Sequence, residues 1–244
     1  MAPVSWIYTQ CYAELEQIGE NRLKTIHSKL PDLVNGSREE EKEEQVMACL
    51  AVRPDDNVLE LGGNIGRLST VIGYITKESG SLWVVEPDSR HVESAILNRD
   101  NAGMDYFIFN GSISKRPIQC LGWPPESIFQ SSNNVSFKDF QSRFCCNKTI
   151  TVLACDCEGA LFYTLFDEPS MLDDIQTVIL ENDFPDTPYL SETFLRRGFQ
   201  NDFPGINRKE WVHDLLKAKG FRTVYQKELL NFQEDFYQVW TKRA

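Results

Sequence analysis

The chain reads Val58-Leu59-Glu60-Leu61-Gly62-Gly63-Asn64-Ile65-Gly66 where a short hydrophobic run ends in glycines. The run has the length of a buried β-strand, and the glycines allow the tight turn that leads from a strand into a helix. A second hydrophobic run, Leu82-Trp83-Val84-Val85, follows and ends on the acid Glu86. Strand, glycine turn, helix and acid-terminated strand in this order predict the first half of a parallel, nucleotide-binding sheet.

The spacing and the charges of this unit indicate which nucleotide it binds. Glu86 follows Gly66 by the ~20 residues at which an acid can accept hydrogen bonds from ribose hydroxyls. A dinucleotide site would show G-x-G-x-x-G, so that the pyrophosphate lies on the helix N-terminus. Here the acid Glu60 precedes Gly62, and a carboxylate repels a pyrophosphate but attracts an amino group. The pattern favours S-adenosylmethionine over NAD; an ordinary strand–turn–helix corner without a ligand is the alternative.

Hydrophobic periodicity predicts alternating strands and helices along most of the chain. We expect strands at 57–61, 82–86, 106–110, 150–155, 175–181, 221–226 and 235–240, and helices at 1–34, 37–51, 65–77, 88–101, 158–167 and 207–219. This alternation predicts an α/β fold with a Rossmann-like, doubly wound, mostly parallel sheet. Only about ten residues join the last two strands, so they should form a C-terminal antiparallel hairpin. We expect one domain over residues 37–244, preceded by a helical N-terminal extension over 1–36.

Two segments are less regular. Residues 112–148 are rich in proline, serine and asparagine and indicate a loop region with one short helix at 136–144. The acidic run 39–44 follows Ser37, a good N-cap whose reciprocal partner would be Glu40. We expect this run to be the solvated first turn of a helix, where the helix dipole favours negative charge.

Composition restricts the partners and the compartment. The 244 residues carry a formal charge of −11, which argues against nucleic acid, because phosphate contacts need clustered lysine and arginine. No stretch has the ~20 apolar residues of a membrane span, and no export signal is apparent. The seven cysteines show no disulfide-framework spacing, so we expect reduced thiols in a cytoplasmic protein. Zinc is disfavoured, because Cys155 and Cys157 would point to opposite faces of a strand.

Polar side chains follow the predicted strands at the edge where doubly wound sheets bind ligands. They are Glu60, Glu86, Ser112, Asp156, Glu158, Glu181, Asn182 and Asp183. Hard divalent cations prefer oxygen ligands of this kind, so Asp156, Glu181 and Asn182 form a candidate Mg²⁺ or Mn²⁺ site. Without a metal, Asp156 or Glu158 could act as the general base on an acceptor hydroxyl. Helix capping by Glu158 is the structural alternative.

Several motifs together resemble the FkbM-type S-adenosylmethionine-dependent methyltransferases. The stretch 59–66 resembles their D-V-G-A-N-I-G motif, Val85-Glu86-Pro87 their F-E-P, Asp156-Cys157-Glu158-Gly159-Ala160 their D-V-E-G-A, and 215–221 their closing L-L-x-x-x-G-Y. The resemblance covers roughly residues 40–240 and implies the class I methyltransferase fold. Leu161 departs from the family's pattern, which has an acid there, and Glu60 replaces its usual aspartate.

The resemblance also implies roles for individual residues. Glu60, Gly62 and Gly66 would hold the methionine end of the cofactor, Glu86 the ribose, and Ser112 would lie near the adenine. Asp156 would face the methyl-transfer centre. The matched motif residues Gly63, Asn64 and Pro87 complete the expected cofactor-binding set.

The family mostly methylates oxygen, often on sugars. We therefore expect an O-methyltransferase acting on a small-molecule or glycan hydroxyl. Asn182 after Glu181 gives a weaker likeness to the magnesium-dependent catechol-type O-methyltransferases. A catalytically inactive binder of the cofactor and a nicotinamide-dependent oxidoreductase are the alternatives.

Overall fold

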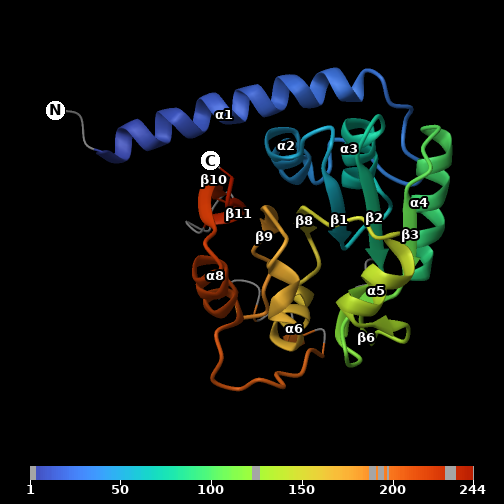
Figure 1. Ribbon diagram of the computed structural model, residues 1–244, viewed down its shortest axis with the longest axis vertical. Coiled ribbons are helices and arrows are strands. Elements are labelled where there is room, and N and C mark those ends of the chain that lie inside the picture. The colour runs from blue at the N-terminus through green and yellow to red at the C-terminus, as the bar shows by residue number, and fades with distance from the viewer. Residues whose placement is uncertain are drawn as a thin grey trace.

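A seven-stranded sheet forms the centre of the protein, in a computed structural model that describes residues 4–122, 127–186, 191, 195–196, 198–228 and 235–243. Its strand order is β10-β11-β9-β8-β1-β2-β3 (Figure 1). The strands are β1 (Asn57–Leu61), β2 (Ser81–Glu86), β3 (Phe107–Asn110), β8 (Val152–Cys155), β9 (Thr177–Glu181), β10 (Arg222–Glu228) and β11 (Asp235–Thr241). Strand β11 pairs antiparallel with β10 and β9, and the other neighbours pair parallel. The predicted fold class is confirmed.

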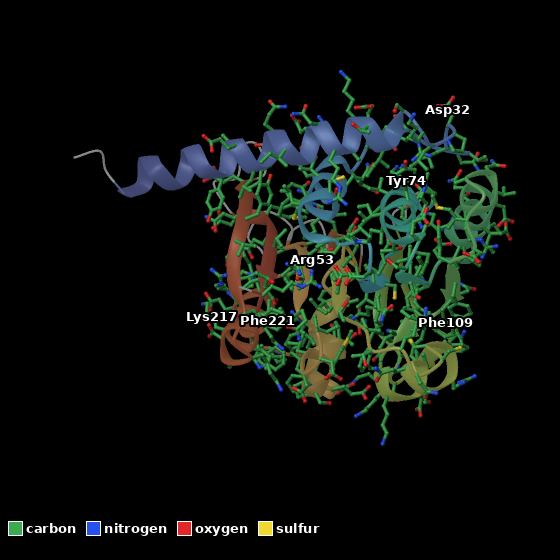
Figure 2. All side chains as sticks on the ribbon, turned by 45° about the horizontal axis from the view of Figure 1, so that its top comes forward. Asp32, Arg53, Tyr74, Phe109, Lys217 and Phe221 are labelled. Carbon is green, nitrogen blue, oxygen red and sulfur yellow. The ribbon has the colours of Figure 1, made fainter. Side chains whose placement is uncertain are left out.

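Helices cover both faces of the sheet (Figure 1). They are α1 (Val4–His27), α2 (Lys42–Ala51), α3 (Arg67–Thr76), α4 (Ser89–Asn101), α5 (Phe137–Phe144), α6 (Ala160–Asp167), the 3₁₀ turn η1 (Pro169–Leu172) and α8 (Arg208–Ala218). Side chains of α1, α2 and α3 pack with one face, and those of α5, α6 and α8 with the other. The N-terminal part of α1 extends past the sheet edge formed by β10 and β11 (Figures 1 and 2). None of the described helices is long and apolar enough to cross a membrane.

The two core layers follow from the alternation of side chains along the parallel strands. Leu59 and Leu61 of β1 pack with the α5, α6 and α8 layer, whereas Val58 packs with the α1, α2 and α3 layer. Because both faces are covered, these strands are hydrophobic along nearly their whole length. Glu60 lies on the same face as Val58 and is buried there, with 1% of its surface exposed.

Two local predictions were wrong. Helix α2 begins at Lys42 rather than after Ser37. The Ser37 hydroxyl does accept a hydrogen bond, from the Glu39 N–H at 3.1 Å, but residues 38–41 form a turn and Glu41 has a left-handed backbone with φ of 51°. The serine therefore caps a turn, and the helix begins only after it.

The segment 112–148 is more ordered than its composition indicates. Strand β4 (Ser112–Ile113) pairs with β7 (Asn134–Val135), and β5 (Gln119–Gly122) pairs antiparallel with β6 (Ser127–Gln130). The short helix predicted at 136–144 is confirmed as α5, with Ser136 as its N-cap. The buried side chains of Ile118 and Val135 anchor this segment to the core. Strands this short carry too little periodicity to be recognised from sequence.

Candidate functional site

A cavity of about 390 Å³ lies at the carboxyl ends of β2, β1, β8 and β9. We call it the strand-end cavity. Residues after these strands line it, together with residues of the turn before α2 and of α2, the β4–β6 segment, α6 and β11. Parallel sheets end all their strands at one edge, so side chains far apart in sequence meet there.

The glycine turn after β1 has a conformation that only glycine tolerates. Gly62 has φ of +88°, and a Cβ atom at this position would lie 1.6 Å from the Asp156 carbonyl oxygen. The N–H groups of Gly62 and Gly63 both donate to the Val85 carbonyl, at 2.9 and 3.1 Å. Gly66, with φ of +89°, is the N-cap of α3. Gly62 lines the cavity, whereas Gly63 and Gly66 shape the turn behind it.

The carboxylate of Glu86 is held in place by backbone amides. Its Oε2 accepts a hydrogen bond from the Asn64 N–H and its Oε1 from the Asp88 N–H, both at 2.8 Å. Each carboxylate oxygen has a second lone pair for a further donor. Glu86, Pro87 and Asn64 all line the cavity, so vicinal hydroxyls such as those of ribose could bind at the end of β2.

The cavity wall beyond Glu86 is mostly apolar. Ile113, Ile118 and Cys120 line it together with Ser112, whose hydroxyl donates to Asn134 Oδ1 at 2.5 Å. A flat apolar ring with a few polar edges fits such a wall. Ser112 lies in this wall, and its contact with an adenine stays a prediction from the motif resemblance.

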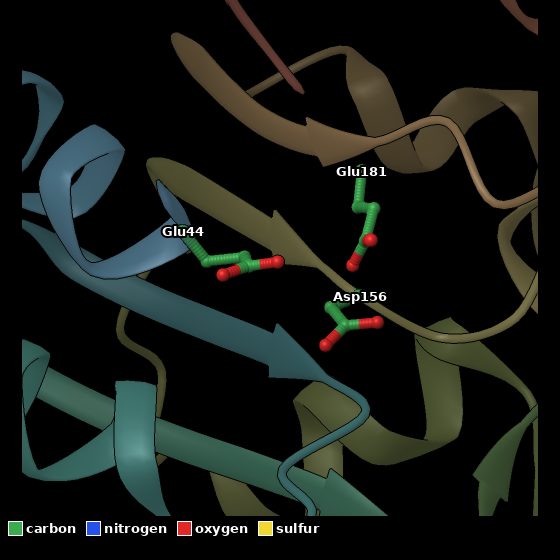
Figure 3. Close-up of side chains that lie close together, drawn as sticks. All are labelled: Glu44, Asp156 and Glu181. Atoms are coloured by element: carbon green, nitrogen blue, oxygen red, sulfur yellow. The ribbon is translucent and has the colours of Figure 1, made fainter. Parts of the chain in front are cut away.

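Three carboxylates meet at the opposite end of the cavity (Figure 3). Glu44 of α2, Asp156 after β8 and Glu181 of β9 each place one carboxylate oxygen within 4.8 Å of the others. Burial, with repulsion from Asp156, raises the pKa of Glu44 to about 8 and holds the pKa of Glu181 well above its ordinary value. Burial also raises the pKa of Asp156. A divalent cation would relieve this repulsion.

Asn182 does not take part in this cluster. Its side-chain amide donates to the backbone carbonyls of Asp235 and Phe236, at 2.9 and 3.1 Å. Its Oδ1 lies 2.8 Å from Nε2 of His213, whose pKa burial lowers to about 4, so the neutral imidazole donates this bond. Successive residues of β9 point to opposite sides, so Glu181 faces the cavity and Asn182 faces β11 and α8. The cluster therefore contains Glu44 where the sequence predicted Asn182.

The structural alternative for Glu158, capping of α6, is wrong, because the N-cap of α6 is Gly159 and no side chain caps it. Asp183 Oδ1 instead accepts a hydrogen bond from the Gly159 N–H at 3.1 Å, which ties the start of α6 to the segment after β9. Glu158 has φ of 53° and lines the cavity together with Asp156. Both remain candidates for a general base.

Glu60 lies behind the cavity rather than in its wall. No described residue is a hydrogen-bond partner of either carboxylate oxygen, and burial raises the pKa of Glu60 to about 8. The face of β1 that carries Glu60 packs against helices, so this side chain is turned away from the ligand edge. The structure thus gives no direct support for contact between Glu60 and a cofactor.

The run 39–44 was expected to be a solvated first turn of a helix, and this expectation is wrong for Glu44, which is buried in α2. Glu41, Glu43 and Glu44 line the strand-end cavity, and Glu44 is only 3% exposed. Glu41 lies in the turn before α2 and Glu44 in the first turn of α2, and both line the cavity. An acidic run also fits a solvated surface, so only the tertiary structure shows that these two side chains face inward.

No family model and no curated protein matches this sequence. Among solved structures, the chain is similar to an O-methyltransferase from Bacillus cereus in complex with SAH, with 12% identity, 96% of this chain and 91% of that chain covered, and a TM-score of 0.52. A candidate O-methyltransferase from Klebsiella pneumoniae gives 12% identity, 93% and 90% coverage, and a TM-score of 0.50. A cofactor-bound protein from MTB gives 9% identity, 94% and 90% coverage, and a TM-score of 0.50.

The fold is that of the class I methyltransferases. At these identities the likeness concerns the fold alone. The resemblance to FkbM-type enzymes stays a prediction from the sequence motifs.

Proposed function

We propose that this protein is an S-adenosylmethionine-dependent methyltransferase that methylates an acceptor hydroxyl. One observation carries the proposal: a single cavity joins the amide-held Glu86 at the end of β2 to the carboxylates of Asp156 and Glu181 after β8 and β9. The similar Bacillus cereus O-methyltransferase, whose structure contains SAH, supports the choice of cofactor.

The strand order fits a nucleoside at one end and an acceptor at the other. Strands β2, β1, β8 and β9 are neighbours in that order, and neighbouring strands lie ~4.8 Å apart, so Glu86 and Glu181 are separated by roughly 14 Å across the sheet. A nucleoside with its ribose on Glu86 and its adenine against Ser112 would direct its sulfonium over Gly62 and Asp156. The acceptor would then enter from the β9 and β11 side, where Phe236 and Tyr237 line the cavity.

The chemistry needs positioning and the removal of one proton. The acceptor oxygen attacks the methyl carbon in line with the sulfonium, the new C–O bond forms, and the S–CH₃ bond breaks to leave a neutral thioether. Without a bound cation, the carboxylate of Asp156 or of Glu158 would take the hydroxyl proton. Burial raises the pKa of Asp156, which makes its carboxylate a stronger base than an exposed one.

The three-carboxylate cluster fits a divalent cation. Glu44, Asp156 and Glu181 would hold Mg²⁺ or Mn²⁺ through oxygen ligands. A bound cation would lower the pKa of the acceptor hydroxyl. Asn182 is excluded as a direct ligand in this arrangement, because its side chain bonds to β11 and α8.

The acceptor class follows from the FkbM-type motifs and not from the cavity. We propose a hydroxyl of a sugar or a related small molecule, and the charge of −11 disfavours a nucleic-acid acceptor. The cysteine pattern supports a cytoplasmic location.

Two measurements test the proposal. Equilibrium dialysis should show binding of S-adenosylmethionine and SAH in preference to NAD; preferential binding of NAD would instead indicate an oxidoreductase. Methyl-labelled cofactor should then transfer its label to members of a glycan and small-molecule acceptor panel, and Asp156→Asn should abolish this transfer. Cofactor binding without transfer to any acceptor would favour an inactive binding protein.

The metal is tested separately. Chelator should abolish transfer and Mn²⁺ should restore it, and Glu181→Gln should weaken Mn²⁺ binding measured by calorimetry in the absence of acceptor. Full activity in chelator would remove the metal from the scheme.

A further inference from the structure

The turn that precedes α2 and the first turn of α2 form one wall of the strand-end cavity. The acidic side chains of this wall have different surroundings. Glu43 pairs with Lys227 of β10 at 3.2 Å, and Glu44 belongs to the three-carboxylate cluster. Glu41 instead lies over the glycine turn that follows β1.

Glu41 is held by two donors from the glycine turn and the helix after it. Its Oε1 accepts a hydrogen bond from Asn64 Nδ2 at 3.1 Å and from Arg67 Nη1 at 2.9 Å. No described residue bonds to its Oε2, and its side chain is 31% exposed. One oxygen therefore fixes the carboxylate in place, and the other is available to a ligand in the cavity.

This wall holds more carboxyl groups than cationic partners. Arg67 forms ion pairs with both Glu40 and Glu41, so two carboxylates share one cation. Three residues further on, Glu44 is 97% buried, lines the same cavity, and has an Oε2 without any hydrogen-bond partner. No lysine or arginine occurs among the described residues that line the cavity. A wall of this kind is complementary to a cationic donor group on a ligand.

The charge also affects the titration of the free protein. Burial, with repulsion from Asp156, raises the pKa of Glu41 to about 7, although Arg67 opposes the change. A cation bound against Glu41 would lower this pKa again.

The position of Glu41 identifies which part of the ligand it meets. A nucleoside whose ribose binds Glu86 at the end of β2 extends its 5′ substituent towards the neighbouring strand β1. A substituent that passes Gly62, which has no side chain, would reach Asn64 and Glu41, which are hydrogen-bonded to each other and line the same cavity. In S-adenosylmethionine the 5′ substituent ends in an α-amino acid, whose ammonium group is the cation that this wall lacks.

We propose that Glu41, held by Asn64 and Arg67, binds the α-amino group of the cofactor and makes the site select nucleosides that carry this group. The inference rests on the proposed function. It assigns to Glu41 the contact that the sequence motifs assign to Glu60, whose side chain lies behind the cavity.

A pair of ligands separates this contact from the rest of the site. SAH carries the amino-acid end, and 5′-methylthioadenosine is the same nucleoside thioether without it. Calorimetry on the full chain should show tighter binding of SAH than of methylthioadenosine. The change Glu41→Gln should weaken SAH binding about tenfold, because a charge-assisted hydrogen bond is lost, and should alter methylthioadenosine binding less than about twofold.

Two further variants control the experiment. Glu39→Gln removes an exposed acid of the same run that does not line the cavity, and it should leave both affinities unchanged. Glu41→Asp keeps the charge and withdraws it by one methylene, so it should lower the SAH preference less than Glu41→Gln does. The aspartate variant also supplies the answer if circular dichroism shows that the glutamine variant does not fold.

The outcomes are distinct. Equal weakening of both ligands by Glu41→Gln, or no weakening of SAH, would overturn the assignment of Glu41 while leaving the proposed function intact. Failure of the parent protein to bind either nucleoside would refute the proposed function itself.

Discussion

Replacing Glu60 by glutamine should stabilise the ligand-free protein at alkaline pH and have little effect in mild acid. Glu60 is 1% exposed, and no described residue is a hydrogen-bond partner of either carboxylate oxygen. Burial is the main cause that raises its pKa from 4.5 to about 8. In the unfolded chain the group loses its proton near its ordinary pKa, whereas the folded state retains it until about pH 8.

The sign and the size of the effect follow from proton linkage. Because the folded state binds more protons between these two pKa values, its stability falls as pH rises through that window. Each pH unit in the middle of this window costs the folded state about 1.4 kcal/mol, and the cost is smaller near the two pKa values, so the penalty from Glu60 grows by roughly 3 kcal/mol between pH 5 and pH 8. Glutamine has nearly the same shape and does not ionise, so the Glu60→Gln variant lacks this loss.

Urea unfolding of parent and variant at pH 5 and pH 8 measures the difference. The amide has its own cost of burial, but that cost is the same at both pH values, so the change between them isolates the ionisation of Glu60. The variant should gain about 3 kcal/mol relative to the parent between pH 5 and pH 8. An equal free-energy difference at both pH values would refute the argument, because it would mean that Glu60 is ionised in the folded protein at pH 5. The affinity for SAH should be unchanged in the Glu60→Gln variant. A large loss of SAH affinity would indicate that Glu60 contacts the cofactor.

Three other substitutions test particular contacts. Gly62→Ala should destabilise the protein by more than about 2 kcal/mol and abolish SAH binding, because the alanine Cβ would overlap the Asp156 carbonyl oxygen. Near-parental SAH binding in calorimetry would contradict the turn geometry. Asp183→Asn should change the free energy of unfolding at pH 7 by less than about 0.5 kcal/mol, because burial keeps the pKa of this carboxyl well above its ordinary value and an amide oxygen can still accept from Gly159. Arg208→Met should lower the free energy of unfolding in urea by about 3 kcal/mol, because it removes the buried guanidinium that pairs with Asp186 and Asp202. A decrease below about 1 kcal/mol would show that these ion pairs contribute little to stability.

The sequence predicted those parts of the fold that local patterns determine. The buried strand before Gly62 and the acid at the end of the next strand gave β1 and β2 nearly to the residue, because a continuous apolar run with a glycine turn has few alternatives. The segment 112–148 was misjudged, since strands β4 to β7 are two to four residues long and depend on partners distant in sequence. The start of α2 was misplaced because Ser37 can cap either a turn or a helix.

The site shows the same division. The position of Glu86, Asp156 and Glu181 at one edge of the sheet was predictable from sequence, because parallel strands all end at the same edge. The direction of a side chain at that edge depends on the strand's register and on what packs against each face. This is why Glu60 turned out to lie behind the cavity, and why His213 and β11 engage Asn182.

By itself, the sequence determined the doubly wound sheet, the glycine turn and the strands whose ends carry acids, since each depends on neighbours within a few residues. Only the tertiary structure decided that the acidic run before α2 folds inward, so that Glu41 meets Asn64 and Glu44 meets Asp156 and Glu181. The physical reason is that burial of a charged run depends on contacts with strands that lie far along the chain, and no local pattern distinguishes an acid that faces a cavity from one that faces water.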